Sequence, residues 1–105
     1  MLGWEIHIIN NATGQEYGDW LTGHKGKDWI EQLVDKGIAE KFYSIASSHY
    51  LIKAKDLMPL IIPSLSCYKQ PPIAGEWVND YVMDATALLS CLPEELIKIQ
   101  TYDAS

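Results

Sequence analysis

The most regular pattern in the chain is the apolar repeat of residues 76–92, EWVNDYVMDATALLSCL. Its apolar side chains recur at steps of three and four residues, which is the period of one face of an α-helix. Gly75 precedes the segment, and Pro93 follows it and cannot extend a helix cheaply. We therefore expect a helix over residues 76–92, with its apolar face as the main internal wall of the domain.

The same segment predicts an acidic stripe on the outer face of that helix. Glu76, Asp80 and Asp84 follow one another at four-residue steps, with no lysine among them. Like charges at this spacing destabilise a helix by about 0.2–0.5 kcal/mol per pair. A charged outer face is also ordinary for a surface helix. The stripe therefore makes a basic partner worth considering without requiring one.

Length and charge narrow the classes of protein. A chain of 105 residues with 48% hydrophobic residues is expected to form one domain, residues 1–105, with a packed core. Its net charge is −6, and its eight basic residues are all lysines. An acidic surface without arginine disfavours binding to nucleic acid or to an anionic membrane. It favours a basic protein partner instead.

The chain shows no signal for export or membrane insertion. Residues 1–11, MLGWEIHIINN, lack the pattern of a signal peptide, and no apolar run reaches the ~18 residues of a membrane span. We expect a cytoplasmic protein. In that compartment Cys67 and Cys91 are expected to be reduced thiols, with a disulfide between them as the alternative.

Several shorter segments also have clear patterns. Residues 4–8 alternate as a strand, with apolar side chains on one side and His7 on the solvated side. Asp28 and Glu31 have the spacing of a capping box, which predicts a helix that ends at Gly37. Residues 10–27 form a long polar connection that is either functional or contains a short extra strand.

The remaining elements complete the predicted fold. The branched and aromatic composition of residues 42–47 and 50–54 predicts a hairpin, and residues 57–62 predict a short helix capped by Asp56. The proline-rich residues 63–75 predict a loop, and residues 96–102 alternate as a closing strand. Together these elements predict an α+β single-domain layer sandwich, with a small, mainly antiparallel sheet covered by about three helices.

No motif assigns a catalytic, cofactor or metal site. His7, His24 and His49 have no metal-type spacing to one another or to a cysteine. Residues 23–27, GHKGK, resemble a phosphate-binding loop only superficially, because His24 stands where that motif needs lysine. We therefore expect a protein that is not an enzyme and that carries no cofactor.

The aromatic residues point to a partner-binding surface. Four tryptophans in a chain of this length are many, and tryptophan and tyrosine are common anchors of protein interfaces. Aromatic residues of the irregular segments, together with neighbouring acids, would make an interface of anchors edged by negative charge. This candidate surface consists of Asp19, Trp20, Tyr68, Glu76, Trp77, Asp80 and Asp84.

In size, acidity and lack of catalytic motifs, the whole chain resembles the immunity proteins encoded beside bacterial polymorphic toxins, including those of contact-dependent growth inhibition. The resemblance lies in this profile and not in a motif. It implies tight binding to the C-terminal domain of a cognate toxin, often a basic nuclease, whose active site the immunity protein covers. One alternative is a non-catalytic adaptor or accessory subunit that binds another basic protein. The other is a small enzyme, which a deep cleft that collects the histidines or Cys67 would favour.

Overall fold

Six strands of one sheet form the frame of the protein. The computed structural model describes residues 3–23, 25–43, 47–65 and 78–103. Along the chain the elements are β1 (Gly3–Asn10), β2 (Glu16–Gly23), α1 (Asp28–Asp35), β3 (Glu40–Tyr43), β4 (Ser47–Lys53), α2 (Ala54–Leu65), β5 (Val78–Met83), α3 (Ala85–Leu89) and β6 (Leu96–Asp103).

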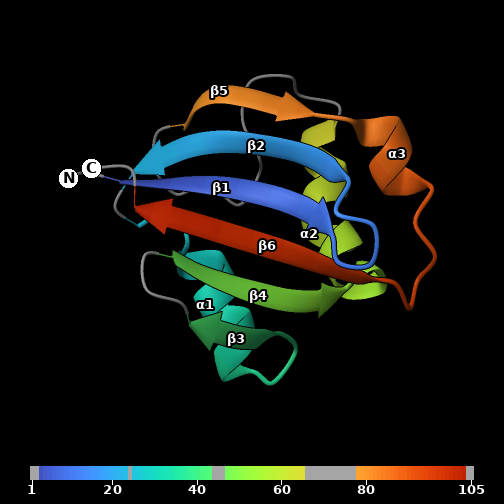
Figure 1. Cartoon of the computed structure of the whole chain (residues 1–105), viewed down its shortest axis with the longest axis horizontal. Coiled ribbons are helices and arrows are strands. Elements are labelled where there is room, and N and C mark those ends of the chain that lie inside the picture. The colour runs from blue at the N-terminus through green and yellow to red at the C-terminus, as the bar shows by residue number, and fades with distance from the viewer. Residues whose placement is uncertain (1–2, 24, 44–46, 66–77, 104–105) are drawn as a thin grey trace.

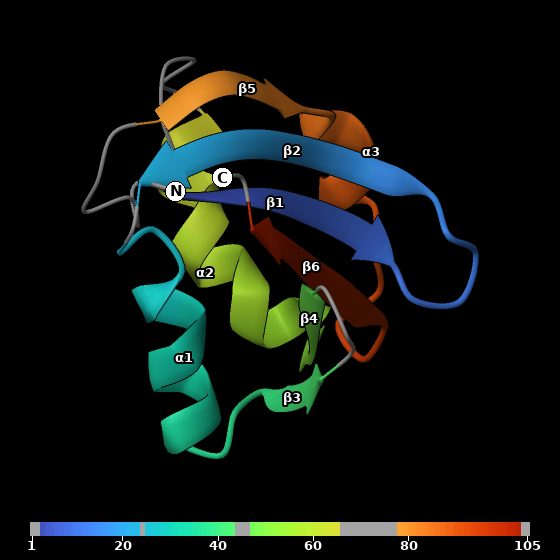
Figure 2. The same cartoon turned by 60° about the vertical axis from the view of Figure 1, so that its left-hand side comes forward.

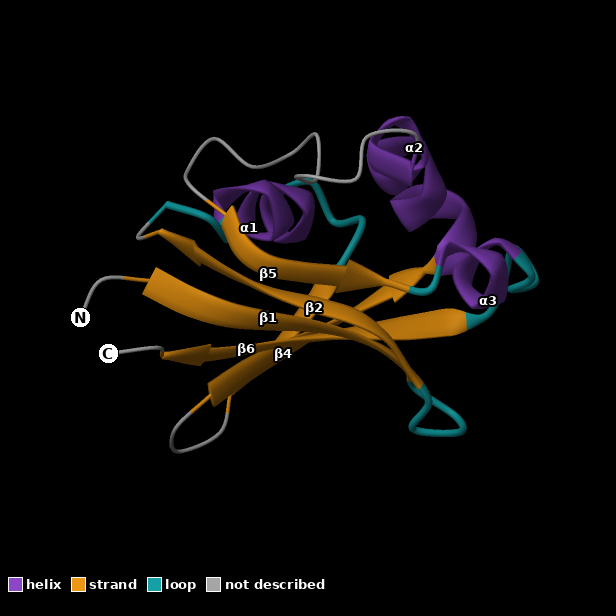
Figure 3. Ribbon diagram, turned by 90° about the horizontal axis from the view of Figure 1, so that it is seen from above, coloured by secondary structure: helices purple, strands orange, loops and turns teal. Residues whose placement is uncertain are grey.

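The strands lie in the order β3-β4-β6-β1-β2-β5, and every neighbouring pair is antiparallel (Figure 1). The three helices of the described chain lie on one side of the sheet (Figure 3). Figure 2 shows α1 and α2 on the same side of the sheet. The predicted α+β layer sandwich is therefore confirmed, with one sheet face that no helix of the described residues covers.

The core lies between the sheet and the helices. Alternate residues of β1 and β6 point into it, and Ile6, Ile8, Ile97 and Ile99 are fully buried. Full burial of such a side chain contributes about 1.5–3 kcal/mol. The two strands predicted from alternation in residues 4–8 and 96–102 are therefore confirmed. Among the side chains that the structure describes, the buried hydrophobic cluster consists of Ile6, Ile8, Tyr17, Trp20, Ile30, Ala39, Tyr50, Ile52, Ala54, Leu57, Leu88, Ile97 and Ile99.

The long polar connection of residues 10–27 contains a strand. Asn10 ends β1, and its Oδ1 accepts hydrogen bonds from the backbone N–H groups of Ala12 and Thr13 at 2.8 and 3.0 Å. Gly14 has a φ of +78°, a left-handed conformation that favours glycine. These features turn the chain back into β2, which pairs with β1 along its length. Residues 10–27 therefore contain the extra strand that the sequence analysis gave as one of two possibilities.

Helix α1 has the predicted length but a different beginning. Gly37, with a φ of +76°, follows its C-terminal end as expected from the sequence. The predicted capping box is wrong, because Lys27 is the N-cap residue and no side chain caps the helix. Glu31 accepts hydrogen bonds from the Tyr50 hydroxyl and from Lys41 Nζ instead. These contacts join α1 to β4 and β3.

The predicted helix over residues 76–92 is wrong. Residues 78–83 form strand β5, and only Ala85–Leu89 form a helix, α3. Valine and tyrosine favour strands, and β5 gains backbone pairing along β2. Asp84 then caps α3, because its carboxylate accepts a hydrogen bond from the Ala87 backbone N–H at 3.1 Å. The expected acidic helix face therefore does not form.

The middle of the chain follows the prediction in type but not in bounds. The expected hairpin is present as β3 and β4. Helix α2 is longer than the predicted residues 57–62, and Pro63 lies within it. Its first two backbone N–H groups, on Ala54 and Lys55, donate to the carbonyls of Glu95 and Pro93. Most of the predicted loop of residues 63–75 lies outside the described residues.

Candidate functional site

One face of the sheet, which we call the open face, is covered by no helix of the described residues and carries side chains from all six strands. Strand register places outward residues side by side, because each is paired with its neighbour across the sheet. One such row runs from edge to edge through Phe42, His49, Gln100, His7, Asp19 and Val82.

An irregularity in β2 adds a second acidic residue to this row. Ile8 pairs with Gly18 and Ile9 pairs with Glu16, so Tyr17 is the extra residue of a β-bulge. Tyr17 and Gly18 are both buried, whereas Glu16 is exposed. In a regular strand Glu16 would point to the same side as Gly18, into the core. The bulge therefore turns Glu16 to the open face, on the same side as Asp19.

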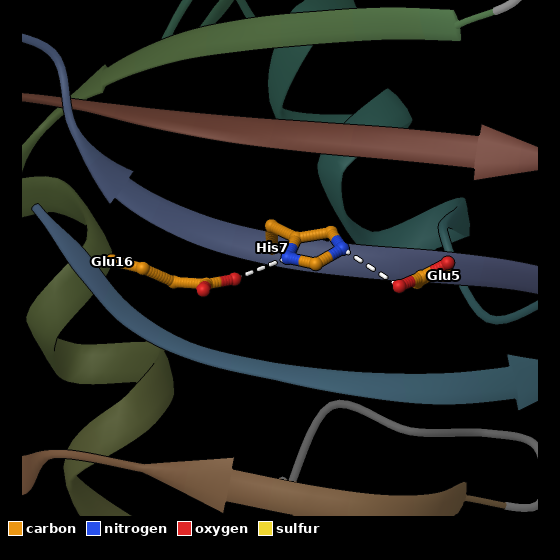
Figure 4. Close-up of polar contacts among 3 residues, drawn as sticks. All are labelled: Glu5, His7 and Glu16. Carbon is orange, nitrogen blue, oxygen red and sulfur yellow. Dashed lines mark hydrogen bonds and ion pairs between the residues drawn. The ribbon is translucent and has the colours of Figure 1, made fainter. Parts of the chain in front are cut away.

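His7 lies between two glutamates, Glu5 and Glu16, on the open face (Figure 4). Its Nε2 is 3.0 Å from Oε1 of Glu5, and its Nδ1 bonds to Oε1 of Glu16 on the neighbouring strand. The ring of Tyr102 meets the imidazole edge-on, with the ring centroids 5.6 Å apart. The His7 side chain is only 20% exposed. The expectation of a simply solvated histidine is therefore wrong.

The electrostatics of the group are dominated by carboxylates. Burial would lower the pKa of His7, but hydrogen bonds to Glu16 and Glu5 and their negative charges raise it above 6.5. Burial raises the pKa of Asp19, and the charge of Glu16 adds to this rise. With His7 protonated, the three carboxylates and one imidazolium of this group sum to a charge of about −2.

The same residues offer ligand atoms of the types that bind metal ions. Atoms of His7, Glu16 and Asp19 lie within 4.8 Å of one another. Both ring nitrogens of His7 are already bonded to carboxylates, however, so neither has a free lone pair directed at a common centre. We therefore interpret the group as a hydrogen-bonded charge cluster and not as a metal centre. We call Glu5, His7, Glu16 and Asp19 the acidic cluster.

Apolar and aromatic side chains surround the acidic cluster on the open face. Tyr102 is 36% exposed, Phe42 is 39% exposed and stacks on His49, and Val82 is 60% exposed. Mixed aromatic and apolar surface around a charged centre is suited to a protein partner more than to a small polar ligand.

The structure separates the residues of the surface predicted from the sequence. Asp19 belongs to the acidic cluster, but Trp20 follows it in β2, points to the opposite side and is only 2% exposed. Trp20 is therefore a core residue and not a surface anchor, which corrects the prediction. Asp84 is exposed at the N-terminus of α3, and Asp80 belongs to β5.

The other predicted surface residues, Tyr68, Glu76 and Trp77, lie outside the described residues. Three residues that the sequence analysis did not assign to a site, Glu5, His7 and Glu16, make up most of the acidic cluster. Alternation in β1 already placed Glu5 and His7 together on the polar side of that strand. The sequence analysis did not assign the strand of residues 16–23, which brings Glu16 and Asp19 beside them.

A pocket of about 340 Å³ lies apart from the acidic cluster, between the turn after β1 and the start of β6. Among the described residues, its lining contains no histidine or cysteine. The lining residues are Asn10, Asn11, Ala12, Thr13, Glu94, Glu95 and Leu96.

Two further findings concern the chain as a whole. Within the described residues, no helix has both the length and the apolar character needed to cross a bilayer. No protein-family model matches the chain, and neither does any curated protein or solved structure.

Proposed function

We propose that this protein is a cytoplasmic immunity protein that binds a basic partner, the toxic domain of a cognate toxin, through the open face of its sheet. The observation that carries this proposal is the acidic cluster. Glu5, Glu16 and Asp19 gather at the middle of an uncovered face around a single imidazole. Such a face attracts and orients positive charge on a partner.

The position of the cluster supports a protein partner. The acids lie on β1 and β2, and the centre of a broad face is where the residues that dominate binding energy usually lie. Tyr102 and Phe42 supply exposed aromatic surface around them. The net charge of −6, with no arginine in the chain, favours the same kind of partner.

Inhibition by such a protein requires no chemistry of its own. A toxin that cleaves nucleic acid binds the phosphates of its substrate with lysine, arginine or histidine side chains. The carboxylates of the acidic cluster would form ion pairs with those basic side chains. The rest of the sheet face would block the access of the substrate to the active site of the toxin. Occlusion of this kind explains why the proposed function needs neither a metal nor a nucleophile.

The test is co-expression with the product of the neighbouring gene, scoring cell survival and co-purification. The variant Glu5→Gln with Glu16→Gln removes two charges from the acidic cluster. Asp28→Asn with Asp35→Asn is the matched control, because it removes two exposed charges from α1 on the helical side of the sheet. Thermal unfolding of both variants checks that each is folded.

We expect the cluster variant to slow association with the partner by about tenfold at low salt, and the control to slow it by less than about threefold. Equal slowing of the two variants would show that only net charge matters. Unchanged binding and survival with the cluster variant would overturn the open face as the binding surface.

A non-catalytic adaptor that binds another basic protein is the alternative function, since it would use the same face. The neighbouring gene distinguishes the two. A neighbour that encodes a large toxin with a basic C-terminal domain favours immunity, and co-purification without any toxicity of the neighbour favours an adaptor.

A further inference from the structure

Each ring nitrogen of His7 forms a hydrogen bond to a carboxylate. One ring nitrogen bonds to Glu5 of β1, and the other bonds to Glu16 of β2 (Figure 4). Carboxylates accept hydrogen bonds, and a neutral imidazole has only one N–H to donate. Both contacts can be hydrogen bonds only if the ring carries two protons. The geometry therefore selects the charged form of His7.

The imidazolium of His7 is the positive charge that directly contacts the carboxylates of the acidic cluster. His49 lies further away, across Gln100 of β6. Lys98 is paired with Ile9 and so lies diagonally from His7, while the imidazole itself touches the carboxylates. The titratable groups that face His7 from the three strands packed around it are Glu5 of β1, Glu16 and Asp19 of β2, and Lys98 and Tyr102 of β6.

We propose that His7 is a proton switch for the open face: a basic partner that binds the acidic cluster displaces the His7 proton, so binding strengthens as the pH rises. This regulation rests on the proposed function, because it assumes that the partner is basic and binds at this face. Loss of the proton changes the charge of the cluster from about −2 to about −3 and frees a carboxylate oxygen for the cation of the partner.

The direction of the pH dependence follows from linkage. A positive group of the partner repels the imidazolium, so the complex holds the proton less tightly than the free protein does. Release of one proton strengthens binding by at most tenfold for each pH unit. This increase occurs only between two pH values, the pKa of His7 in the complex and the pKa of His7 in the free protein. Because the carboxylates raise the pKa of His7 above 6.5, this interval extends above that value.

The first experiment measures the switch without a partner. Imidazole ¹H–¹⁵N spectra recorded from pH 5 to 9 give the titration midpoint of His7 and show which nitrogens carry protons. We expect a midpoint above 6.5, and a lower midpoint in Glu16→Gln. Asp28→Asn with Asp35→Asn changes the net charge by more than Glu16→Gln does. This control should nevertheless leave the midpoint of His7 nearly unchanged. A wild-type midpoint at or below 6.5 would overturn the proposal.

The second experiment measures the coupling with a defined probe, a decalysine peptide. Calorimetric titration at pH 6 to 9, in two buffers of different ionisation enthalpy, gives both the affinity and the number of protons released. We expect up to one proton released and an affinity that rises up to about tenfold per pH unit within the interval. His7→Gln, which has no titrating ring, should bind with an affinity that does not change over this range.

The outcomes separate the switch from the proposed function. Tight binding by wild type with no pH dependence would overturn the switch and leave the acidic cluster as a binding site. An equal pH dependence in His7→Gln would assign the proton to another group and also overturn the switch. Absence of binding by both proteins would overturn the open face as a cation-binding surface, and with it the coupling.

Discussion

The thiol of Cys91 donates a hydrogen bond to the hydroxyl of Tyr17 at 3.1 Å, although the two residues are 74 positions apart. The same hydroxyl accepts a hydrogen bond at 2.8 Å from Nδ2 of Asn10, which is buried. One oxygen thus joins the segment after α3 to β2 and to the end of β1. The β-bulge that turns Glu16 outward is the feature that sends Tyr17 inward to this position.

Removal of that oxygen should weaken the fold. Tyr17→Phe leaves the buried Asn10 donor without this partner, and we expect the free energy of unfolding to fall by about 1–3 kcal/mol. Cys91→Ala removes a weak donor and one partly buried sulfur atom that packs against the core, and it should cost less. Urea unfolding monitored by tryptophan fluorescence measures both. Equal losses for the two variants would contradict the role assigned to the Tyr17 hydroxyl.

Glu31 should contribute stability that disappears in acid. Burial would raise its pKa, but hydrogen bonds from Lys41 and Tyr50 lower it below its ordinary value of 4.5. The contribution is therefore complete above 4.5 and is lost as the pH falls through the lower value of the folded protein. Because the Glu31 side chain is 35% exposed, we expect Glu31→Gln to cost only about 1 kcal/mol at neutral pH.

The control for Glu31 is Glu94, which pairs with Lys53 and Lys55 and whose side chain is 64% exposed. Glu94→Gln should change the free energy of unfolding much less than Glu31→Gln. Unfolding curves from pH 3 to 7 provide the comparison. A difference between wild type and Glu31→Gln that does not shrink as the pH falls from 7 to 3 would show that the loss arises from packing and not from charge.

His7 should give the opposite pH dependence of stability. Its pKa is raised in the folded protein, so its contribution is complete below 6.5 and is lost as the pH rises through the folded value. Wild type should therefore lose stability between pH 6 and 9, whereas His7→Gln should lose less over the same range. Urea midpoints at several pH values measure this. Parallel curves for the two proteins would contradict the prediction.

Asp84 tests the corrected secondary structure. As the N-cap of α3 it bonds to the Ala87 N–H, so Asp84→Ala should lower the free energy of unfolding by about 0.5–2 kcal/mol. Asp84→Ser should recover most of that loss. On the outer face of a continuous helix, the alanine substitution would instead be neutral or stabilising, because it would remove a like-charge repulsion.

The parts of the fold that the sequence predicts well have one uninterrupted period. Residues 4–8 and 96–102 alternate without a break, and Ile30, Leu33 and Val34 lie on one side of α1 and pack against or within the core. Residues 76–92 fail because a strand and a short helix follow one another there. Their combined apolar spacing imitates a single helical face, and sequence period alone cannot separate the two.

The candidate site depends on tertiary structure more than on pattern. Strand β2 contains Gly18, Asp19 and Gly23, which are poor strand formers, so its conformation comes from pairing with β1 and β5. The bulge at Tyr17 decides on which side Glu16 lies, and no residue pattern signals it. The sequence therefore singled out Asp19 as a candidate surface residue but could not place Glu5, His7 and Glu16 beside it.

The place of β6 has a consequence for synthesis of the protein. It is the last strand of the described residues, yet it lies between β4 and β1 and pairs with both. Until it emerges from the ribosome, the β3–β4 hairpin shares no ladder with β1, β2 and β5. The six-stranded sheet therefore cannot close until residues 96–103 have left the ribosome, and before then β4 and β1 each have an unpaired strand edge.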